Sequence, residues 1–418
     1  MMRVAITGFG VVSPIGIGRD AFWDALATGR SGIARITRFD CSTFAVQLAG
    51  EVREMPELPG EVAAITVQDP KVGFGYAACA EALSAAGITR LGGAPGDGVT
   101  LLHLGVSLEI FDMQKAICGG RPDFRTIAER SLRPDAAPLQ IPLDTAAAVI
   151  ARRFGPPDRV LTNCSACAAG AQAIGHSFRA IRAGRCQVAV CGGLDSMINP
   201  LGVGGFQMLG ALTTDNARGA SACRPFDASR SGTVLGEGAA FCVLEPLELA
   251  CAAGKPILAE ICGYGSSLDA WNLSAPDPEG DGAARAMQAA LDDAGIAPAR
   301  IGHINAHGTG TRANDVVEAV AIRRVFADYW PRIPVSATKS MTGHLIAAAG
   351  AVEIGACLLP LVRRLVPPNP SLEKVGQDCE LAHVTGTAAA RFDGEYVLSN
   401  SFGFGGQNAS IVLRRYDG

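Results

Sequence analysis

The stretch Val160-Leu161-Thr162-Asn163-Cys164-Ser165-Ala166-Cys167-Ala168-Ala169-Gly170 joins a short apolar strand to an Ala-rich helix. The helix is predicted over residues 168–182, is ended by Gly184, and is followed by a second apolar strand at residues 188–191. This strand–helix–strand order is typical of a βαβ unit in a sheet that is buried on both faces. Cys167 lies at the strand-to-helix turn, where α/β enzymes expose nucleophiles and where the free helix amides favour thiolate over thiol.

A similar pattern, a β-prone run that ends in a glycine turn, recurs in the second half of the chain. The β-prone run 4–10, which ends in Gly-Phe-Gly, is echoed by the run 259–265, which ends in Gly-Tyr-Gly. Strands and helices alternate in both halves, so the sequence predicts α/β layers and an internal duplication. At 418 residues the chain also exceeds the roughly 250–300 residues that one hydrophobic core supports. We therefore expect two halves, residues 1–250 with the cysteine turn and residues 251–418 with two histidine turns.

The composition indicates a well-buried globular protein that acts on small molecules. Hydrophobic residues make up 48% of the chain and charged residues 18%, and the mean hydropathy is +0.23. The net charge of −4 is spread without long runs, which argues against a nucleic-acid or anionic-membrane partner. No apolar run reaches the roughly 20 residues that a bilayer demands. The 13 cysteines are odd in number, lie mostly in apolar runs and follow no secretory signal, so we expect a reducing cytoplasm.

Two segments each place a histidine on a tight turn of small residues. They are Asn305-Ala306-His307-Gly308-Thr309-Gly310-Thr311 and Lys339-Ser340-Met341-Thr342-Gly343-His344. Glycines in the first segment let a ligand approach the backbone, and its threonines offer hydrogen bonds. One nucleophilic cysteine with two imidazoles can perform acyl transfer, which requires no metal or redox cofactor.

Each of these residues also has a structural interpretation. A cysteine among alanines and glycines is commonly a small buried hydrophobe, and Cys164 with Cys167 forms a Cys-x-x-Cys pair that could be redox-active. A histidine on a turn can simply be hydrogen-bonded there. Lys339 could be a surface cation, and Glu353, on an apolar helix, could be a buried structural acid that needs a partner. The glycine-rich loop Phe402-Gly403-Phe404-Gly405-Gly406 could serve only to close a hairpin.

Two irregular tracts are long for connectors. Residues 119–142 hold four prolines and scattered arginines, and residues 199–219 are rich in glycine. We expect both to be loop-rich segments that cover a site or a dimer contact.

Taken together, these segments resemble the condensing enzymes of the thiolase fold, most closely the β-ketoacyl-acyl carrier protein synthases of type II fatty-acid and polyketide systems. The resemblance runs from the opening strand to the closing Asn400-Ser401-Phe402-Gly403-Phe404-Gly405-Gly406, and it includes Asp227-Ala228-Ser229-Arg230-Ser231-Gly232-Thr233-Val234-Leu235-Gly236-Glu237-Gly238. It implies an α/β fold of the thiolase-like, duplicated, five-layer α-β-α-β-α type.

The resemblance also implies a role for each catalytic residue. Cys167 would accept the acyl group, while His307 and His344 would promote malonyl decarboxylation and stabilise the resulting enolate. Lys339 would tune the surroundings of the second histidine, with Glu353 in support.

Other implied roles concern the walls of the site. Backbone amides of Cys167 and Phe404 would form the oxyanion hole, and Phe404 would also gate the acyl pocket. Asn400 and Gly405 of the closing motif would support the site. Thr309 and Thr311 would line the path of a phosphopantetheine arm, which belongs to the substrate and is not a bound cofactor.

Chain length would depend on pocket depth. The side chains concerned would be those that meet across a dimer, at Val106, Ser107 and residues 139–145.

The implied reaction is a decarboxylative Claisen condensation of a cysteine-bound acyl chain with malonyl-acyl carrier protein. The implied partners are an acyl carrier protein and a second subunit, which is either another copy or a chain-length-factor-like protein. Asn163-Cys164, Gly210 and Gln407 depart from the pattern of elongation enzymes, and the presumed docking helix has few basic residues besides Lys71. A specialised polyketide pathway and housekeeping fatty-acid elongation both stay open, as do a thiolase-like CoA-dependent acyltransferase and a non-catalytic subunit.

Overall fold

Two sets of five strands meet edge to edge in one mixed sheet at the centre of the protein. The computed structural model describes residues 2–55, 57–92, 98–111, 117–118, 121–122, 125, 129 and 140–418. The first set, in spatial order, is β10 (Arg159–Asn163), β5 (Thr100–Gly105), β11 (Val188–Ser196), β12 (Leu235–Pro246) and β1 (Val4–Ser13). The second set continues with β13 (Ala259–Leu268), β19 (Gln407–Arg414), β18 (Tyr396–Gly403), β14 (Ile301–Asn305) and β15 (Val335–Ser336). β1 and β13 pair antiparallel over residues 4–6 and 259–261, so a short ladder joins the two sets.

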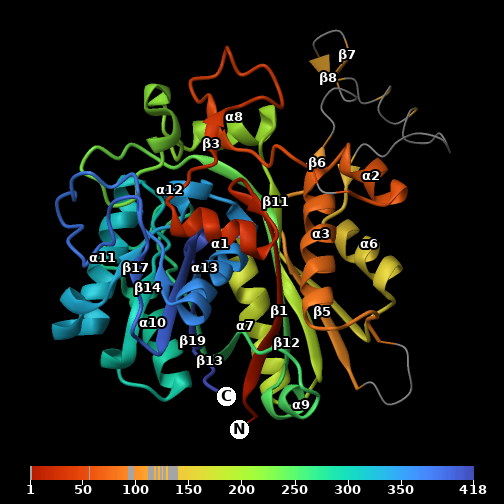
Figure 1. The fold of residues 1–418 in the computed structure, drawn as a ribbon. Coiled ribbons are helices and arrows are strands. Elements are labelled where there is room, and N and C mark those ends of the chain that lie inside the picture. The colour runs from red at the N-terminus through yellow and green to blue at the C-terminus, as the bar shows by residue number, and fades with distance from the viewer. Residues whose placement is uncertain are drawn as a thin grey trace.

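Helices lie in three layers around the two sets of strands (Figure 1). One outer layer consists of α2 (Gly60–Thr66), α3 (Pro70–Ala85) and α6 (Thr145–Phe154). The other outer layer consists of α10 (Asp281–Ala294) and α11 (Arg312–Phe326). Between the two sets lie α7 (Ala169–Arg182) and α13 (Ala349–Arg363), which share one apolar core with both. This α-β-α-β-α order confirms the duplicated, thiolase-like five-layer fold.

Shorter elements complete the fold. The remaining helices are α1 (Arg19–Ala27), α8 (Pro200–Met208), α9 (Leu247–Ala252) and α12 (Lys339–Thr342). The remaining strands are β2 (Gly16–Ile17), β3 (Ile33–Arg35), β4 (Leu48–Gly50), β6 (Ile110–Phe111), β7 (Ile117–Cys118), β8 (Arg121–Pro122), β9 (Gln140–Ile141), β16 (Leu365–Val366) and β17 (Ala390–Arg391). One stretch, Ile346–Arg363, is long and apolar enough to cross a bilayer, but 89% of it is buried inside the protein, as in a core helix.

The two Gly-aromatic-Gly runs bring the outer helices close to the sheet. A Cβ on Gly8 or Gly10 of β1 would lie 2.1 Å from a carbonyl oxygen of α3, and one on Gly263 or Gly265 of β13 would lie 2.1 Å from a carbonyl oxygen of α10. No side chain fits at that distance, so only glycine lets these helices pack so closely. The same packing therefore occurs twice, in agreement with the predicted duplication.

The aromatic residues of the same runs point the other way, into the central layer. A Cβ added to Gly355 of α13 would lie 2.2 Å from the ring of Phe9, and one added to Gly175 of α7 would lie 2.3 Å from the ring of Tyr264. Each strand therefore packs a large ring against a glycine of a central helix. This contact fixes the distance between that helix and the sheet. This contact positions the N-terminal ends of α7 and α13, where the site lies.

The structure changes several sequence-based expectations. Residues 199–219 are not simply a loop, because Asn199 caps α8 by accepting a hydrogen bond from the Gly202 N–H at 2.8 Å, and Pro200 opens that helix. Lys71 is buried and ion-paired with Asp69, so it offers no basic group on the surface of α3. The predicted cap at residues 119–142 lies largely outside the described residues. The proposed division of the chain at residue 250 falls within α9 and remains a proposal.

Candidate active site

Cys167 lies in a single 3-10 turn between the end of β10 and the start of α7. The residue before it, Ala166, has a φ of +48°, a left-handed conformation that turns the chain sharply from strand to helix. The pseudo-equivalent turn before α13 has Ile346 at a φ of +46° and places Ala347 where the first half has Cys167. Both halves thus build a nucleophile turn, and only the first half carries a sulfur there.

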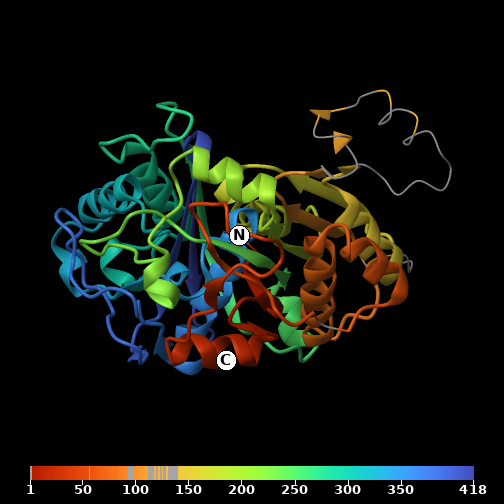
Figure 2. The same ribbon diagram turned by 90° about the horizontal axis from the view of Figure 1, so that it is seen from above.

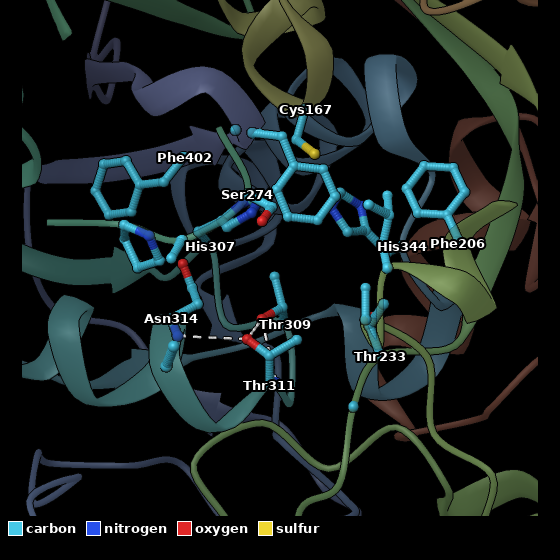
Figure 3. A pocket seen from close by; sticks show the side chains of 18 of the residues that line it. Cys167, Phe206, Thr233, Ser274, His307, Thr309, Thr311, Asn314, His344 and Phe402 are labelled. Carbon is cyan, nitrogen blue, oxygen red and sulfur yellow. Dashed lines mark hydrogen bonds between the residues drawn. The ribbon is translucent and has the colours of Figure 1, made fainter. Parts of the chain in front are cut away.

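The Cys167 side chain is buried and lines a cavity of about 480 Å³ (Figure 3). His307, from the turn after β14, and His344, from the turn after α12, line the same cavity. The ring centroids of the two histidines lie 5.3 Å apart at an interplanar angle of 80°. Three segments that are far apart in the sequence therefore bring one thiol and two imidazoles to the same space.

Hydrogen bonds on the protein side set the tautomer of each histidine. Nδ1 of His344 accepts the Ile346 N–H at 3.1 Å, and Nδ1 of His307 lies 3.2 Å from the Lys339 ammonium. An ammonium and an amide N–H can only donate, so each Nδ1 must be the acceptor and each Nε2 must carry the ring hydrogen. Both rings are thereby prepared to donate an Nε2–H into the cavity.

Lys339 directs all three of its donors at acceptors near His307. Besides Nδ1, its Nζ donates to the His307 carbonyl oxygen at 2.6 Å and to Glu353 Oε1 at 2.5 Å. Lys339 acts on His344 through its charge, which lowers the pKa of that ring. Lys339 thus bonds directly to the first histidine, and its charge also acts on the second, whose surroundings the resemblance implies that it tunes.

Both histidines are held neutral. Burial lowers the pKa of His307 and of His344 well below the usual 6.5, and the nearby positive charge of Lys339 lowers both pKa values further. A neutral imidazole with its hydrogen on Nε2 is a hydrogen-bond donor for a developing oxyanion and does not bring a formal charge.

The thiol of Cys167 behaves differently from the sequence-based expectation of a thiolate. Burial raises its pKa to about 11, although the Lys339 charge and the Phe404 backbone amide both act to lower it. Removal of the sulfur from water outweighs the helix amides, because the thiolate loses more solvation than these groups return. The resting cavity therefore holds a thiol.

The pH dependence of alkylation tests this raised pKa. The rate at which iodoacetamide modifies Cys167 is expected to rise about tenfold per pH unit from about pH 6 to pH 9, without a plateau, since the reactive thiolate is a minor species throughout. Peptide mass spectrometry would separate Cys167 from the exposed Cys164. A plateau reached by neutral pH would mean that Cys167 is a thiolate at rest.

The Lys339–Glu353 ion pair is almost fully buried, with 1% and 3% of the side chains exposed. Lys339→Met leaves Glu353 alone in the core and is expected to lower the free energy of unfolding by about 3–5 kcal/mol at about pH 8. Burial already raises the pKa of Glu353 to about 7, and removal of Lys339 raises it further. A group with a raised folded-state pKa stabilises at low pH and loses that contribution as pH rises through its pKa, so the loss should be smaller at about pH 5.5.

Urea unfolding at the two pH values measures this effect. The exposed pair of Arg285 with Asp281, in which 52% and 44% of the side chains are exposed, supplies the control: Arg285→Met should cost about 0–1 kcal/mol. The double variant Lys339→Met with Glu353→Gln should recover part of the loss. Equal destabilisation at both pH values would show that an unpaired Glu353 charge is not the cause.

The closing motif lies against the cysteine turn. A Cβ on Gly403 would meet the Cys167 backbone nitrogen at 3.0 Å, so glycine allows this approach. The amides of Phe404 and of Cys167 itself both act on the Cys167 sulfur and lower its pKa. Two backbone donors therefore converge where an oxyanion of a cysteine thioester would form.

Phe404, which the resemblance implies is a gate, lines two neighbouring cavities. Phe404 stacks on Phe206 with ring centroids 6.3 Å apart, between the main cavity and a second one of about 370 Å³ that Cys164, Ser107 and Gln407 also line. Gly405 has a φ of +75°, which favours glycine in the turn that carries the ring. Val106, proposed for chain length, packs instead in the outer core under α3.

Two buried acids that sequence reasoning missed hold the first histidine turn. Glu318 accepts the N–H groups of His307 and Gly308 at 2.7 and 2.8 Å, and Asp315 accepts those of Thr309 and Gly310 at 3.1 and 3.2 Å. Acidic residues on the buried face of the predicted helix after the turn were the available signal, since buried carboxylates need donors.

Asn400 supports this arrangement from behind. Its Nδ2 donates to Glu318 at 3.2 Å, and its Oδ1 accepts from Ser410 at 2.8 Å. Thr309 and Thr311 line the cavity and hydrogen-bond to each other at 2.8 Å (Figure 3). They present hydroxyl groups along the path to Cys167.

The sulfur and the two imidazoles also have the geometry of a possible metal group, with ligand atoms within 4.8 Å of one another. A metal would need an Nε2 without a hydrogen, and that tautomer would place N–H groups at both Nδ1 positions. Those hydrogens would face the Ile346 amide and the Lys339 ammonium. The donor set therefore does not fit a metal, and its absence remains our prediction.

A duplicated five-layer fold, in which one buried cysteine faces two neutral histidines, defines a thiolase-fold condensing enzyme. The chain matches the N-terminal domain of β-ketoacyl synthases over residues 1–250 and their C-terminal domain over residues 258–373. The chain belongs to the β-ketoacyl synthase family and is accordingly a ketosynthase, an enzyme of the acyltransferase class.

Similar proteins come from fatty-acid and polyketide systems. The chain is 38% identical to the 3-oxoacyl-[acyl-carrier-protein] synthase 2 of Coxiella burnetii, over 99% of this chain and 98% of that protein. It resembles the solved ishigamide ketosynthase/chain length factor with a TM-score of 0.85, at 35% identity over 99% of both chains. It also resembles a chain of the AntDE:AntF complex, a type II PKS acyl-carrier protein with its ketosynthase bound to the hexaketide. There the TM-score is 0.83, at 29% identity over 99% of this chain and 100% of that chain.

Proposed function

We propose that the chain elongates an acyl group held on Cys167 by decarboxylative condensation with malonyl-acyl carrier protein. In the first half-reaction, the Cys167 sulfur attacks the thioester carbonyl carbon of an acyl carrier protein. The carbonyl oxygen takes the negative charge between the amides of Cys167 and Phe404. The new carbon–sulfur bond replaces the old one, and the proton of Cys167 ends on the released pantetheine sulfur.

The second half-reaction uses the two histidines. A malonyl thioester loses CO₂, and the electron pair of the broken carbon–carbon bond forms an enolate whose oxygen accepts the Nε2–H groups of His307 and His344. The enolate carbon then attacks the acyl carbonyl on Cys167 and expels the sulfur, which takes up one proton. Burial of the site excludes water, which would otherwise hydrolyse the thioester or protonate the enolate.

The observation that carries this proposal is the pair of histidines whose Nδ1 atoms face donors of the protein. Two neutral Nε2–H donors beside one thiol suit an enolate, whereas a thiolase-like reaction needs a base to remove a proton. A non-catalytic subunit would not need the arrangement at all.

Intact-protein mass spectrometry tests the proposal. Incubation with a panel of acyl-carrier proteins should add one acyl mass, which peptide mapping should locate on Cys167. Malonyl carrier protein should then release that mass as an extended β-ketoacyl product. Extension from acetyl-CoA or other CoA esters without any carrier protein would instead support a thiolase-like enzyme, and a failure of every carrier to acylate Cys167 would contradict the proposal.

The pathway is proposed to be a specialised type II system. The departures at Asn163-Cys164, Gly210 and Gln407 favour this reading over housekeeping fatty-acid elongation, and similarity to a ketosynthase/chain length factor supports it. We propose an obligate dimer, with another copy or a chain-length-factor-like subunit as partner, that acts in the cytoplasm. Sedimentation that shows a stable, active monomer would contradict the dimer.

A further inference from the structure

The turn Ile346–Ala348, which precedes α13, is held by a carboxylate from the other half of the chain. The Ala347 N–H donates to Oδ2 of Asp195 at 2.9 Å, across 152 residues of sequence. Asp195 lies on β11 and is 1% exposed. The bond joins the two halves, whose outer helices lie at opposite sides of the molecule in Figure 2 (orange and cyan). No step of the proposed reaction uses this buried acid.

The turn contains a residue in an unfavourable conformation. Ile346 has a φ of +46°, and a β-branched side chain rarely adopts this left-handed region. Such a conformation costs free energy and persists only where the surrounding structure holds it. The Asp195 carboxylate holds the peptide group that follows Ile346, so it fixes one side of the strained residue.

The carbonyl group of Ala347 is also closely packed. A Cβ on Gly193 of β11 would lie 2.5 Å from that carbonyl oxygen, and one on Gly170 of α7 would lie 2.7 Å from it. Both positions must therefore be glycine for the turn to come this close. The N–H and the C=O of Ala347 are thus both in contact with the first half, which leaves the turn little freedom to rotate.

The other side of the strained residue reaches the second histidine. Ile346 donates its N–H to Nδ1 of His344 at 3.1 Å. The backbone of His344 is fixed separately, because its N–H donates to the Val234 carbonyl at 2.7 Å and its carbonyl accepts the Gly236 N–H at 2.8 Å. The Nδ1 bond therefore decides how the ring is rotated and which nitrogen carries the hydrogen.

We propose that Asp195 is a positioning residue for His344: its carboxylate holds the Ile346–Ala347 peptide so that the Ile346 N–H stays on Nδ1 and the Nε2–H is directed into the cavity. The role rests on the proposed function, because only the enolate step requires that Nε2–H. Asp195 does not line the Cys167 cavity, so it acts through the turn and not on the reacting atoms.

Asp195 also carries a charge near the nucleophile. Burial raises the pKa of Asp195 to about 6, so the group is a carboxylate at about pH 8. Burial is the main cause of the raised pKa of the Cys167 thiol, and the Asp195 charge adds to it. Replacement of Asp195 therefore removes a hydrogen-bond acceptor and a charge together, and variants must separate the two.

Two variants make this separation. Asp195→Asn keeps an oxygen that can accept the Ala347 N–H and removes the charge, whereas Asp195→Ala removes both. By rapid quench, Asp195→Ala is expected to lower the condensation rate about 10- to 100-fold and to leave Cys167 acylation within about threefold of wild type, since a misdirected His344 affects only the enolate step. Asp195→Asn should keep both rates within about threefold. In both variants iodoacetamide should modify Cys167 faster at about pH 8, because a negative charge near the thiol is gone.

Nitrogen NMR of ¹⁵N-labelled histidine rings reads the tautomer without any substrate. The chain has six histidines, and the signals missing from His344→Gln identify those of His344. Wild type and Asp195→Asn should show the hydrogen on Nε2 of His344, and Asp195→Ala should show a mixture of the two tautomers. If Asp195→Ala does not fold, Asp195→Ser takes its place, because the shorter serine side chain does not reach the Ala347 N–H.

Glu81 supplies a matched control. This partly buried carboxylate on α3 accepts the Val11 and Arg19 N–H groups at 2.9 and 2.7 Å, and it lines neither cavity. Glu81→Ala also leaves backbone donors without their acceptor. It should therefore lower the thermal stability but leave the ratio of condensation to acylation unchanged.

The outcomes separate positioning from other roles. An Asp195→Ala protein with normal condensation, or with the wild-type tautomer at His344, would overturn the proposal. A parallel fall of acylation and condensation would indicate a merely structural role, and equal losses in Asp195→Asn and Asp195→Ala would indicate a charge effect; either result also overturns it. If wild type neither takes up an acyl group nor condenses, the proposed function fails, and the tautomer of His344 in the variants still decides whether Asp195 positions the ring.

Discussion

Cys167→Ala is expected to abolish transfer of an acyl group from carrier thioester to protein, to the limit of detection, whereas Cys164→Ala is expected to leave it intact. Cys164 and Cys167 are three residues apart in the chain, and both line the smaller cavity of about 370 Å³. Only Cys167 lies with His307 and His344 and beneath the amides that would hold the oxyanion. The sulfur of Cys164 is 2.7 Å from the Ser107 carbonyl oxygen, so it is directed away from this group.

Intact-protein mass spectrometry after incubation with acyl carrier protein measures the difference. Alanine at position 167 removes one sulfur and leaves the histidines in place, so thermal unfolding should show a folded protein. The variant should also retain slow decarboxylation of malonyl carrier protein. If acylation were lost in Cys164→Ala and kept in Cys167→Ala, the nucleophile would be Cys164 and the prediction would be wrong.

His307→Ala and His344→Ala are each expected to keep acylation of Cys167 and to lower condensation by about 10²- to 10⁴-fold. The reason is that acylation depends on backbone amides, whereas the enolate depends on the two Nε2–H donors. Glutamine at either position still offers an N–H, so His307→Gln and His344→Gln should recover part of the lost rate. Rapid quench of the condensation step, with acylation followed separately, distinguishes the two half-reactions.

His176 provides the control for this pair, because it is exposed on α7 and lies outside the cavity lining. His176→Ala should change neither half-reaction. Since burial and the Lys339 charge hold the pKa values of His307 and His344 well below 6.5, protonation of these rings should not slow condensation between about pH 8 and pH 6. A rate that falls with a pKa near 6.5 would show that one ring is charged at neutral pH.

The local pattern of the chain predicts much of the site. The strand–turn–helix around Cys167 and the glycine-flanked histidines are visible within windows of about ten residues, since turns and helix ends depend on neighbouring residues. The echo of 4–10 at 259–265 likewise predicts the duplication, because glycine is required wherever a helix packs onto a strand this closely. Recognition of the family then adds the roles of residues such as Phe404.

Other properties depend on the assembled structure. The sequence places Lys339 five residues from His344, yet its ammonium bonds to His307, which is 32 residues away. The pKa of the Cys167 thiol rises because packing buries it, although its local position at a helix start favours thiolate. The pattern of residues 199–219 predicts a loop-rich segment, although Asn199 and Pro200 start α8 there.

The sequence by itself thus determined the strand, helix and turn pattern, the duplication, and which residues are the candidates for the chemistry. The tertiary structure alone decided which of those residues touch, how strongly each is desolvated, and which apolar groups remain in water. The physical reason is one of range: backbone preferences act over a few residues, whereas burial and electrostatics sum over segments that only folding brings together.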